Sequence, residues 1–363
     1  MSEFKPGLEG VVAFETDIAE PDKEGSALRY RGVDIEDLVG AVSYDQVWGL
    51  LVDGCWEPGL TPTERCTLPL RSGDARVDLQ AGLAELAPTW QLGPLFDIDD
   101  AQAREDLARC SATAISFVAQ SARGEAGPVA QTEIDKAKSI PERFLLEWRG
   151  EADPQHVEAI NAYWIVSAEH GMNASTFTGR VVASTGADVA ACLSAAVGAL
   201  SGPLHGGAPA RVLEALDEME EVGDAGTYVK AVLDRGDRLM GFGHRVYRAE
   251  DPRAQVLRRI AKELKSPRYE AAEALEKAAI AELHARKPDR VLETNVDFWS
   301  AVVLDFAQVP ADLTTPMFAC ARAAGWSAHI LEQKRTGRLV RPSARYVGCA
   351  PRPRSDVPQT NAP

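Results

Sequence analysis

Three of the six histidines in this 363-residue chain lie next to glycine. His170 occurs in AEHGMNAST, His205 in SGPLHGGAP and His244 in GFGHRVYR. Glycine lets a ligand come close to the backbone, and an imidazole at such a position can point into a cleft. These three histidines are therefore candidate site residues. The other three lie in helical patterns and are expected to be structural: His156 and His284 on the surface, His329 hydrogen-bonded within a helix.

Two carboxylates and an arginine occupy positions that suit anion binding and proton transfer. Asp251-Pro252-Arg253 has the pattern of an N-cap, a helix-starting proline and an arginine, and a helix N-terminus with a guanidinium can hold a carboxylate. Asp297, in TNVDFW, also lies near a helix start, where the helix dipole favours the ionised form. An ionised carboxylate there could act as a general base. On local grounds alone, plain helix capping is the more common reason for such residues at either position.

Several sequence signatures of other sites do not occur. There is no GxxxxGK[ST], GxSxG or HExxH motif, and GFGHRV does not continue as GxGxxG. The three glycine-flanked histidines and Asp297 could in principle hold a metal ion. No two of them have chelating spacing, so we expect no metal site.

Charge and composition limit the possible ligands. The formal net charge of −15 disfavours non-specific binding to nucleic acid or to anionic membranes. An anionic ligand would need a local cluster of arginines. The chain shows no signal peptide and no run of about 18 apolar residues, and its six scattered cysteines suit reduced core thiols. We expect a cytoplasmic protein.

Helical periodicity dominates the chain, so the predicted fold class is all-α. A Ser43–Gln46 capping box opens one helix, and apolar spacing predicts others over 99–124, 153–171, 188–200 and 267–285. Alternating patterns typical of strands are confined to VVAFET, ALRYRG and ARYVG. No βαβ rhythm recurs, which argues against a doubly wound sheet.

Two breaks suggest a smaller helical domain inserted in a larger one. SGPLHGGAPA at 201–210 and Val309-Pro310 enclose about 100 residues of shorter, charged helices. We therefore predict a large domain over 1–207 and 313–363, with a loose tail from about 350, and a small domain over 208–312. Two ordinary inter-helix loops remain the alternative.

The motifs together resemble the citrate synthase family. EHGMNAST, GPLHGGA, GFGHRVYRAEDPR, NVDFW and EQKRTGRLVRPSARYVG occur in the family's order, and GLEGVVAFET and LRYRGVDIEDL fit its N-terminal part. The resemblance covers about residues 7 to 348 and is closest to the short bacterial and archaeal dimeric type. It implies a homodimeric acyltransferase of the tricarboxylic acid cycle that joins acetyl-CoA to oxaloacetate, converting the acyl group to an alkyl group on transfer.

The resemblance also implies that the active site lies between the large and the small domain, which close over it, and it implies roles for individual residues. His205 would hydrogen-bond the thioester oxygen, Asp297 would remove the methyl proton, and His244 would polarise the oxaloacetate ketone. Oxaloacetate itself would be held by four side chains: His170, Arg253, Arg322 and Arg341. Arg341 would come from the neighbouring subunit, with Arg345 as a competing candidate. Coenzyme A would be bound by Arg248 and by Met240, Gly241, Phe242 and Gly243.

These roles make chemical sense without any cofactor. A methyl group beside a thioester is a very weak acid, so its deprotonation needs a base together with a hydrogen-bond donor at the thioester oxygen. Arginines answer the question of how so acidic a protein binds a dianion.

Three alternatives remain. A 2-methylcitrate synthase shares these residues and uses propionyl-CoA, and one methylene changes binding by only about 1–3 kcal/mol. A metal-dependent hydrolase would use the histidines and Asp297 as ligands. A non-catalytic helical binding protein would need no intact set of His205, His244 and Asp297.

Overall fold

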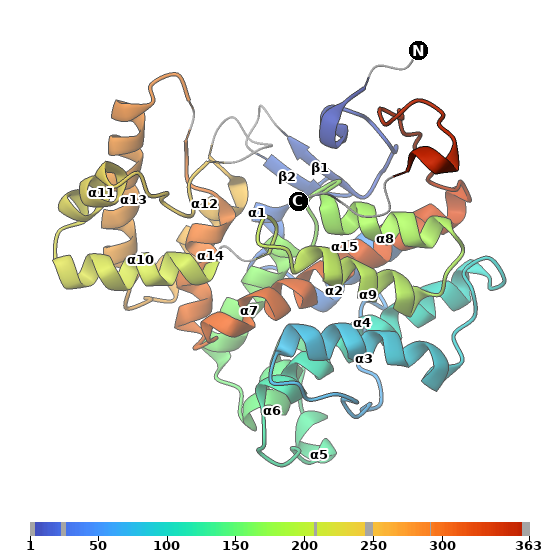
Figure 1. Cartoon of the computed structure of the whole chain (residues 1–363). Coiled ribbons are helices and arrows are strands. Elements are labelled where there is room, and N and C mark those ends of the chain that lie inside the picture. Colours follow the sequence, from blue (N-terminus) through green and yellow to red (C-terminus); the bar gives the residue numbers. More distant parts are fainter. Residues whose placement is uncertain (1–3, 23–26, 207–208, 244–249, 291, 358–363) are drawn as a thin grey trace.

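The structure, a computed structural model, describes residues 4–22, 27–206, 209–243, 250–290 and 292–357. Helices dominate it, as the all-α prediction requires (Figure 1). The helices are α1 (Ile35–Leu38), α2 (Tyr44–Asp53), α3 (Ala75–Trp90), α4 (Asp100–Ala122), α5 (Gln131–Ile134), α6 (Ile140–Arg149), α7 (Pro154–Ser167), α8 (Ala174–Ser184), α9 (Val189–Leu200), α10 (Pro209–Val222), α11 (Ala225–Asp234), α12 (Pro252–Glu263), α13 (Tyr269–Arg286), α14 (Val296–Phe306) and α15 (Thr314–Thr336). The strands β1 (Ala19–Asp22), β2 (Ala27–Tyr30) and β3 (Val33–Asp34) form a small antiparallel sheet in the order β1-β2-β3.

Helix α15 is the centre of the larger group of helices. It packs against α2, α4, α7, α8 and α9, and its side chains are buried on nearly every side from Thr314 to Gln333. A helix enclosed in this way needs small residues where neighbours approach, and the segment FACARAAGWSAH supplies them. At Gly325, for example, an added Cβ atom would lie 2.5 Å from the carbonyl oxygen of Ala168. Only glycine fits there.

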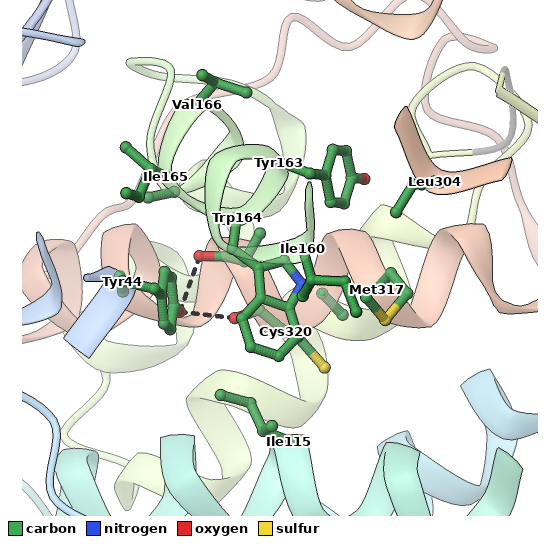
Figure 2. Close-up of a cluster of buried hydrophobic side chains, with 14 of the residues drawn as sticks. Tyr44, Ile115, Ile160, Tyr163, Trp164, Ile165, Val166, Leu304, Met317 and Cys320 are labelled. Carbon is green, nitrogen blue, oxygen red and sulfur yellow. Dashed lines mark hydrogen bonds between the residues drawn. The ribbon is translucent and has the colours of Figure 1, made fainter. Parts of the chain in front are cut away.

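Aromatic side chains fill the space between α7 and α15. Trp164 is fully buried, and Tyr44 and Phe144 pack against it with ring centroids 5.3 and 5.4 Å away (Figure 2). The Tyr44 hydroxyl donates to the carbonyl oxygens of Cys320 and Ala321 at 2.7 and 3.0 Å. The polar end of the buried Tyr44 thus finds backbone partners, which keeps the cost of its burial low.

Helices α10 to α14 form a second group that lies to one side of α15 (Figure 1). Within the group α12 packs against α14, α10 against α14 and α11 against α13. Helices α12 and α14 also pack against α7 of the larger group. This group falls inside the predicted small domain, 208–312, although the domain boundaries themselves stay a prediction.

Most predicted helices are present close to their expected limits. The Ser43–Gln46 capping box is formed, and the predicted apolar face of α9, Val189, Leu193, Val197 and Leu200, is buried. The predicted helix over 267–285 starts two residues later than expected, since Pro267 precedes Arg268, the N-cap residue of α13. Of the predicted strand ALRYRG, the first four residues, ALRY, form strand β2.

Two predicted strands are wrong. The segments VVAFET and ARYVG are neither helix nor strand, and Val12 and Val347 are more than four-fifths exposed. The partner of β2 is instead Ala19–Asp22, a segment without an alternating pattern. A strand needs a neighbouring backbone for its hydrogen bonds, and alternation alone does not provide one.

The exposure of the cysteines and of the C-terminal residues can be compared with the expected core thiols and loose tail. All six cysteines are free thiols, but only Cys110, Cys192 and Cys320 are buried, whereas Cys55 and Cys349 are exposed. Residues 341 to 357 are exposed throughout. Across the described ranges, we find no helix with the length and apolar character to cross a bilayer.

Candidate active site

Asp251 and Arg253 form a buried pair at the start of α12. Asp251 is the N-cap residue and accepts from the backbone N–H of Arg253 at 3.0 Å. Its carboxylate also accepts two hydrogen bonds from the Arg253 guanidinium: Oδ1 accepts from Nε at 3.0 Å, and Oδ2 accepts from Nη2 at 2.7 Å. Both residues are at most 3% exposed. The predicted N-cap, first-turn proline and arginine are therefore confirmed as local structure.

The same carboxylate reaches the helix that carries Asp297. Asp251 Oδ2 accepts from the backbone N–H of Val296 at 3.1 Å. Asp297 follows in the first turn of α14, where its own N–H is capped by the Asn295 side chain at 3.0 Å. One buried aspartate thus fixes the start of α12 against the start of α14.

Burial shifts the pKa of Asp297. It raises the pKa to about 6; the Arg253 guanidinium opposes part of that rise and the Asp251 carboxylate adds to it. Desolvation of the carboxylate therefore outweighs the influence of the helix N-terminus, which favours the ionised form. A carboxylate with a pKa near 6 is a stronger base than an ordinary aspartate and is still ionised at neutral pH.

The segment Met240–Gly243 is held directly beside the start of α14. Its backbone pairs with residues 293–295: Asn295 N donates to Gly241 O at 2.9 Å and Gly243 N donates to Glu293 O at 2.7 Å. The φ of Gly241 is +89°, and an added Cβ atom there would lie 2.9 Å from the Cβ of Phe298. The glycines of GFG are therefore required by backbone geometry, which places this segment next to Asp297. Its expected contact with coenzyme A remains a prediction.

His205 is placed at the N-terminus of α8 through Ser175. Its Nε2 lies 2.9 Å from the Ser175 hydroxyl, which also accepts from Trp326 Nε1 at 3.1 Å and lies 2.8 Å from Asn173 Oδ1. Burial and then the Arg322 guanidinium lower the pKa of His205 to about 4. The imidazole is therefore neutral at neutral pH and can act as a neutral hydrogen-bond donor.

Arg322 is buried in α15 between His205 and the end of α7. It is 1% exposed, its Nε donates to the Ser167 carbonyl oxygen at 2.8 Å, and the guanidinium lies 4.8 Å from the Phe318 ring centre. Burial lowers its pKa, while the Glu169 carboxylate raises it and Arg253 lowers it further. The structure therefore brings four predicted site residues, Arg322, His205, Arg253 and Asp297, into one electrostatic neighbourhood.

The remaining predicted residues are placed less directly. His170 is partly buried in the turn between α7 and α8, directly after the fully buried Glu169. Arg341 is exposed beyond the end of α15, as is Arg345, whose guanidinium lies 5.2 Å from the Phe4 ring centre. In a single chain Arg341 does not join the others. Both His244 and Arg248 lie outside the described residues.

Three residues around the site were not singled out as functional from the sequence. Ser175 lies in EHGMNAST, two positions after the Asn173 N-cap, and its role depends on a contact with His205 thirty residues away. Glu169 precedes the predicted His170. His329 was expected to be a hydrogen-bonded helix residue, which is confirmed, and it contacts Glu169. Only the position of Ser175 and Glu169 inside a site motif could have indicated them.

Chemically, the arrangement combines a base with an anion site. Asp297 offers a partly buried carboxylate, His205 a neutral imidazole, and Arg253 and Arg322 two fixed positive charges. Such a set suits the removal of a proton from carbon beside a carbonyl group, with a bound dianion close by.

Comparison with known proteins agrees with this chemistry. The family model for the citrate synthase C-terminal domain matches residues 7–343. A Mycobacterium tuberculosis protein provisionally named citrate synthase 2 is 66% identical over 351 residues, which cover 96% of this chain and 94% of that protein. The 2-methylcitrate synthase of Shewanella oneidensis is 32% identical, with 95% of each chain covered.

A solved structure is also similar. The citrate synthase of Thermoplasma acidophilum, in a ternary complex with carboxymethyl coenzyme A and oxaloacetate, matches with a TM-score of 0.82 at 28% identity. The match covers 97% of this chain and 98% of that one.

Proposed function

Because the chain belongs to the citrate synthase family, we propose that it is an acyltransferase that condenses acetyl-CoA with oxaloacetate and hydrolyses citryl-CoA to citrate and coenzyme A. The observation that carries this proposal is the set formed by Asp297, with a pKa near 6, the neutral His205 and the buried Arg253 and Arg322.

The first step is proton removal from acetyl-CoA. Asp297 takes a methyl proton while His205 donates a hydrogen bond to the thioester oxygen, where negative charge develops. This role requires the proton of His205 on Nδ1, so Nε2 must accept from the Ser175 hydroxyl. Ser175 has a single proton, and its second acceptor, Asn173 Oδ1, competes for it. Donation by Ser175 to His205 is the arrangement that fits the reaction.

The second step forms the carbon–carbon bond. The nucleophilic methylene carbon attacks the ketone carbon of oxaloacetate, and the ketone oxygen takes up a proton. We assign polarisation of that ketone to His244, and the binding of oxaloacetate to His170, Arg253 and Arg322. Arg248 and Met240–Gly243 would hold coenzyme A. Water then cleaves the thioester of citryl-CoA, which releases citrate and the thiol. Each step needs only proton transfer and charge stabilisation, so we expect no cofactor.

We propose that a neighbouring subunit completes the oxaloacetate site. Arg341 is exposed in the single chain and lies beyond the end of α15. A homodimer in which Arg341 reaches the partner's oxaloacetate would account for both facts.

Propionyl-CoA is the alternative acyl donor. Its use would make the protein a 2-methylcitrate synthase, and the relative from Shewanella oneidensis carries that name. We favour acetyl-CoA because the relative with 66% identity is provisionally named a citrate synthase.

The proposal is tested by the loss of thioester absorbance when the purified protein is mixed with oxaloacetate and acetyl-CoA. We expect turnover that depends on oxaloacetate and disappears in Asp297→Ala. Following the thioester directly avoids the six thiols of the chain. Loss of thioester that continues in Asp297→Ala would contradict the assignment of the base.

A further inference from the structure

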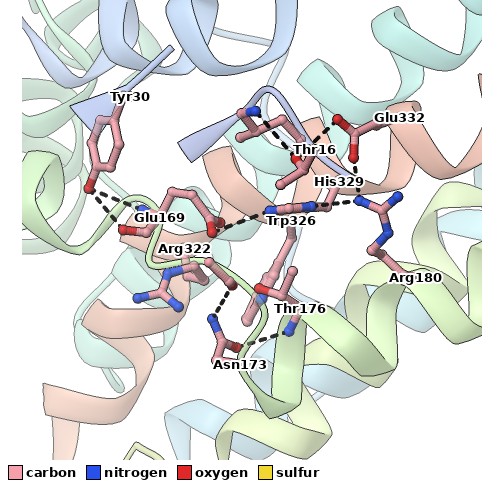
Figure 3. Close-up of polar contacts among 12 residues, drawn as sticks. Thr16, Tyr30, Glu169, Asn173, Thr176, Arg180, Arg322, Trp326, His329 and Glu332 are labelled. Carbon is pink, nitrogen blue, oxygen red and sulfur yellow. Dashed lines mark hydrogen bonds and ion pairs between the residues drawn. The ribbon is translucent and has the colours of Figure 1, made fainter. Parts of the chain in front are cut away.

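A row of buried polar side chains lies behind the proposed oxaloacetate site (Figure 3). It begins at Glu169, which directly precedes His170, and continues through His329 to Arg180. These three side chains are at most 1% exposed. Complete burial of a charged group costs free energy unless an opposite charge or hydrogen bonds compensate it, so the contacts along this row matter for the state of each side chain.

The contacts define which nitrogen of His329 carries its proton. Arg180 Nη1 lies 2.8 Å from His329 Nδ1, and a guanidinium can only donate. Nδ1 therefore accepts, and the proton of the neutral imidazole is on Nε2. This nitrogen lies 3.3 Å from Glu169 Oε1. His329 therefore lies between the two side chains: its Nδ1 accepts from Arg180, and its Nε2 faces the Glu169 carboxylate at ion-pair distance.

Glu169 is held from two sides. Its backbone is fixed by the Tyr30 hydroxyl, which donates to Glu169 O at 3.1 Å and accepts from Glu169 N at 3.2 Å. Its side chain faces Gly325, where an added Cβ atom would lie 2.1 Å from Oε2. The space for the carboxylate therefore exists only because position 325 is glycine.

The carboxylate remains charged in this position. Burial by itself would raise the pKa of Glu169, but His329, Arg322 and the backbone N–H of His170 together bring the pKa below its ordinary value. Glu169 also acts in return on Arg322, since it is the largest influence that favours the charged guanidinium there. Glu169 is therefore next in sequence to one proposed oxaloacetate-binding residue, His170, and acts electrostatically on another, Arg322.

The far end of the row is anchored at the N-terminal segment. Arg180 Nη1 donates to Glu332 Oε2 at 2.5 Å, and Glu332 Oε1 accepts from Thr16 Oγ1 at 3.1 Å. The row therefore alternates in charge: the negative Glu332 is followed by the positive Arg180. Beyond the neutral His329, the negative Glu169 is followed by the positive Arg322.

We propose that Glu169, oriented by His329, is a positioning residue that sets the places of His170 and Arg322 for binding the oxaloacetate dianion. This inference rests on the proposed function and extends it to residues that do not touch substrate. A purely structural network would instead support folding without affecting one substrate more than the other.

The test compares two substitutions of one residue. His329→Gln keeps an acceptor for Arg180 and a donor for Glu169, whereas His329→Met has similar bulk and keeps neither. We expect the KM for oxaloacetate to rise about tenfold in His329→Met, to return close to the original value in His329→Gln, and the KM for acetyl-CoA to stay nearly constant in both.

Ser327→Ala is the matched control on the same helix. Ser327 is fully buried in α15, and its hydroxyl lies 3.0 Å from that of Ser111 on α4. We expect this variant to lose thermal stability without a change in the KM for oxaloacetate. Equal changes of both KM values in His329→Met, or a lower melting temperature alone, would overturn the proposal.

Two further measurements keep the test decisive. If His329→Met does not fold, Arg180→Lys keeps the positive charge but loses the planar fork, and the same selective rise in KM is expected on a smaller scale. Nitrogen-15 NMR of the imidazoles should also show His329 protonated on Nε2, and protonation on Nδ1 would overturn the proposal. Since that spectrum requires no turnover, it separates failure of the network from failure of the proposed function, for which an inactive unaltered enzyme would be the sign.

Discussion

The carboxylate of Asp251 takes the guanidinium of Arg253 at two points, with Oδ2 only 2.7 Å from Nη2. The same oxygen accepts from the backbone N–H of Val296, the residue before the proposed base Asp297. The arginine proposed to bind substrate and the proposed base, on different helices, therefore share one anchor. In the proposed function this would link the binding of oxaloacetate to the position of the group that deprotonates acetyl-CoA.

Asp251→Ala should damage both binding and stability. The change leaves the buried charge of Arg253 without its carboxylate, which typically costs about 3–5 kcal/mol of unfolding free energy. We expect a higher KM for oxaloacetate and a lower midpoint in urea, measured by steady-state kinetics and equilibrium unfolding. Asp234→Ala is the control, because its pair with Arg286 is exposed and should contribute less than about 1 kcal/mol. Equal effects of the two variants would contradict the anchoring role.

The pH dependence of turnover should report the pKa of Asp297. The base must be ionised, so kcat/KM for acetyl-CoA is expected to fall as the pH drops through about 6. His205 should not limit this range, since burial and Arg322 lower its pKa to about 4 and it stays neutral. A pH–rate profile from 5 to 8.5 checks this. A kcat/KM that stays constant down to pH 5 would contradict the role given to burial.

Asp297→Asn should change stability in a pH-dependent direction. The folded pKa of about 6 lies above the ordinary 3.8, so folding retains a proton. The stability that this proton contributes is complete below the unfolded pKa and is lost as the pH rises through about 6. At pH 7.5 the native protein therefore carries a cost of up to about 3 kcal/mol that the asparagine avoids.

We thus expect the inactive Asp297→Asn to melt at a higher temperature than the unaltered protein at pH 7.5. The difference should shrink or vanish at pH 4.5. Thermal unfolding at the two pH values measures it, and a variant less stable at both would argue against a desolvated carboxylate.

Ser175→Ala tests the hydrogen-bonding state of His205. Without the hydroxyl, nothing holds Nε2 as the acceptor, and His205 can carry its proton on the wrong nitrogen. We expect kcat to fall roughly 10- to 100-fold with little change in the KM for oxaloacetate. Ser201→Ala serves as the control, because Ser201 is exposed and bonds only the Gly198 carbonyl oxygen. An unchanged kcat in Ser175→Ala would show that Ser175 does not set the tautomer.

Mixing two inactive variants tests the contribution of Arg341 across a dimer. Arg341→Ala and Asp297→Asn homodimers should each be inactive, but a mixed dimer holds one site with both residues intact. Random exchange of subunits should restore about a quarter of the full activity. Arg345→Ala should keep its own activity. If mixing restores nothing after confirmed exchange, Arg341 does not act on the neighbouring site.

The long helices were predictable because their signals are local. The Ser43–Gln46 capping box, the apolar face of α9 and the Asp251 N-cap each depend on residues within a few turns. The strands were predictable only in part. Strand β2 lies within the predicted ALRYRG, but VVAFET alternates without a partner, whereas Ala19–Asp22 pairs with β2 without alternating.

The site residues divide in the same way: local motifs indicate some of them, and contacts between residues distant in sequence determine the rest. Sequence motifs identified His205, Arg253, Arg322 and Asp297, which the structure brings together. They did not indicate the raised pKa of Asp297, which arises from burial after folding. Nor did they indicate Ser175 or the row behind Glu169, since these contacts join residues 30 and 160 positions apart.

The most direct test of the central claim is one competition experiment. Purified protein is given oxaloacetate with equal concentrations of acetyl-CoA and propionyl-CoA, and the products are identified by mass spectrometry. We predict that citrate exceeds methylcitrate by about tenfold or more and that Asp297→Ala makes neither, with the ratio limited by the free energy of one methylene. Methylcitrate as the main product would contradict the proposed acyl donor, and product formation without Asp297 would contradict the mechanism.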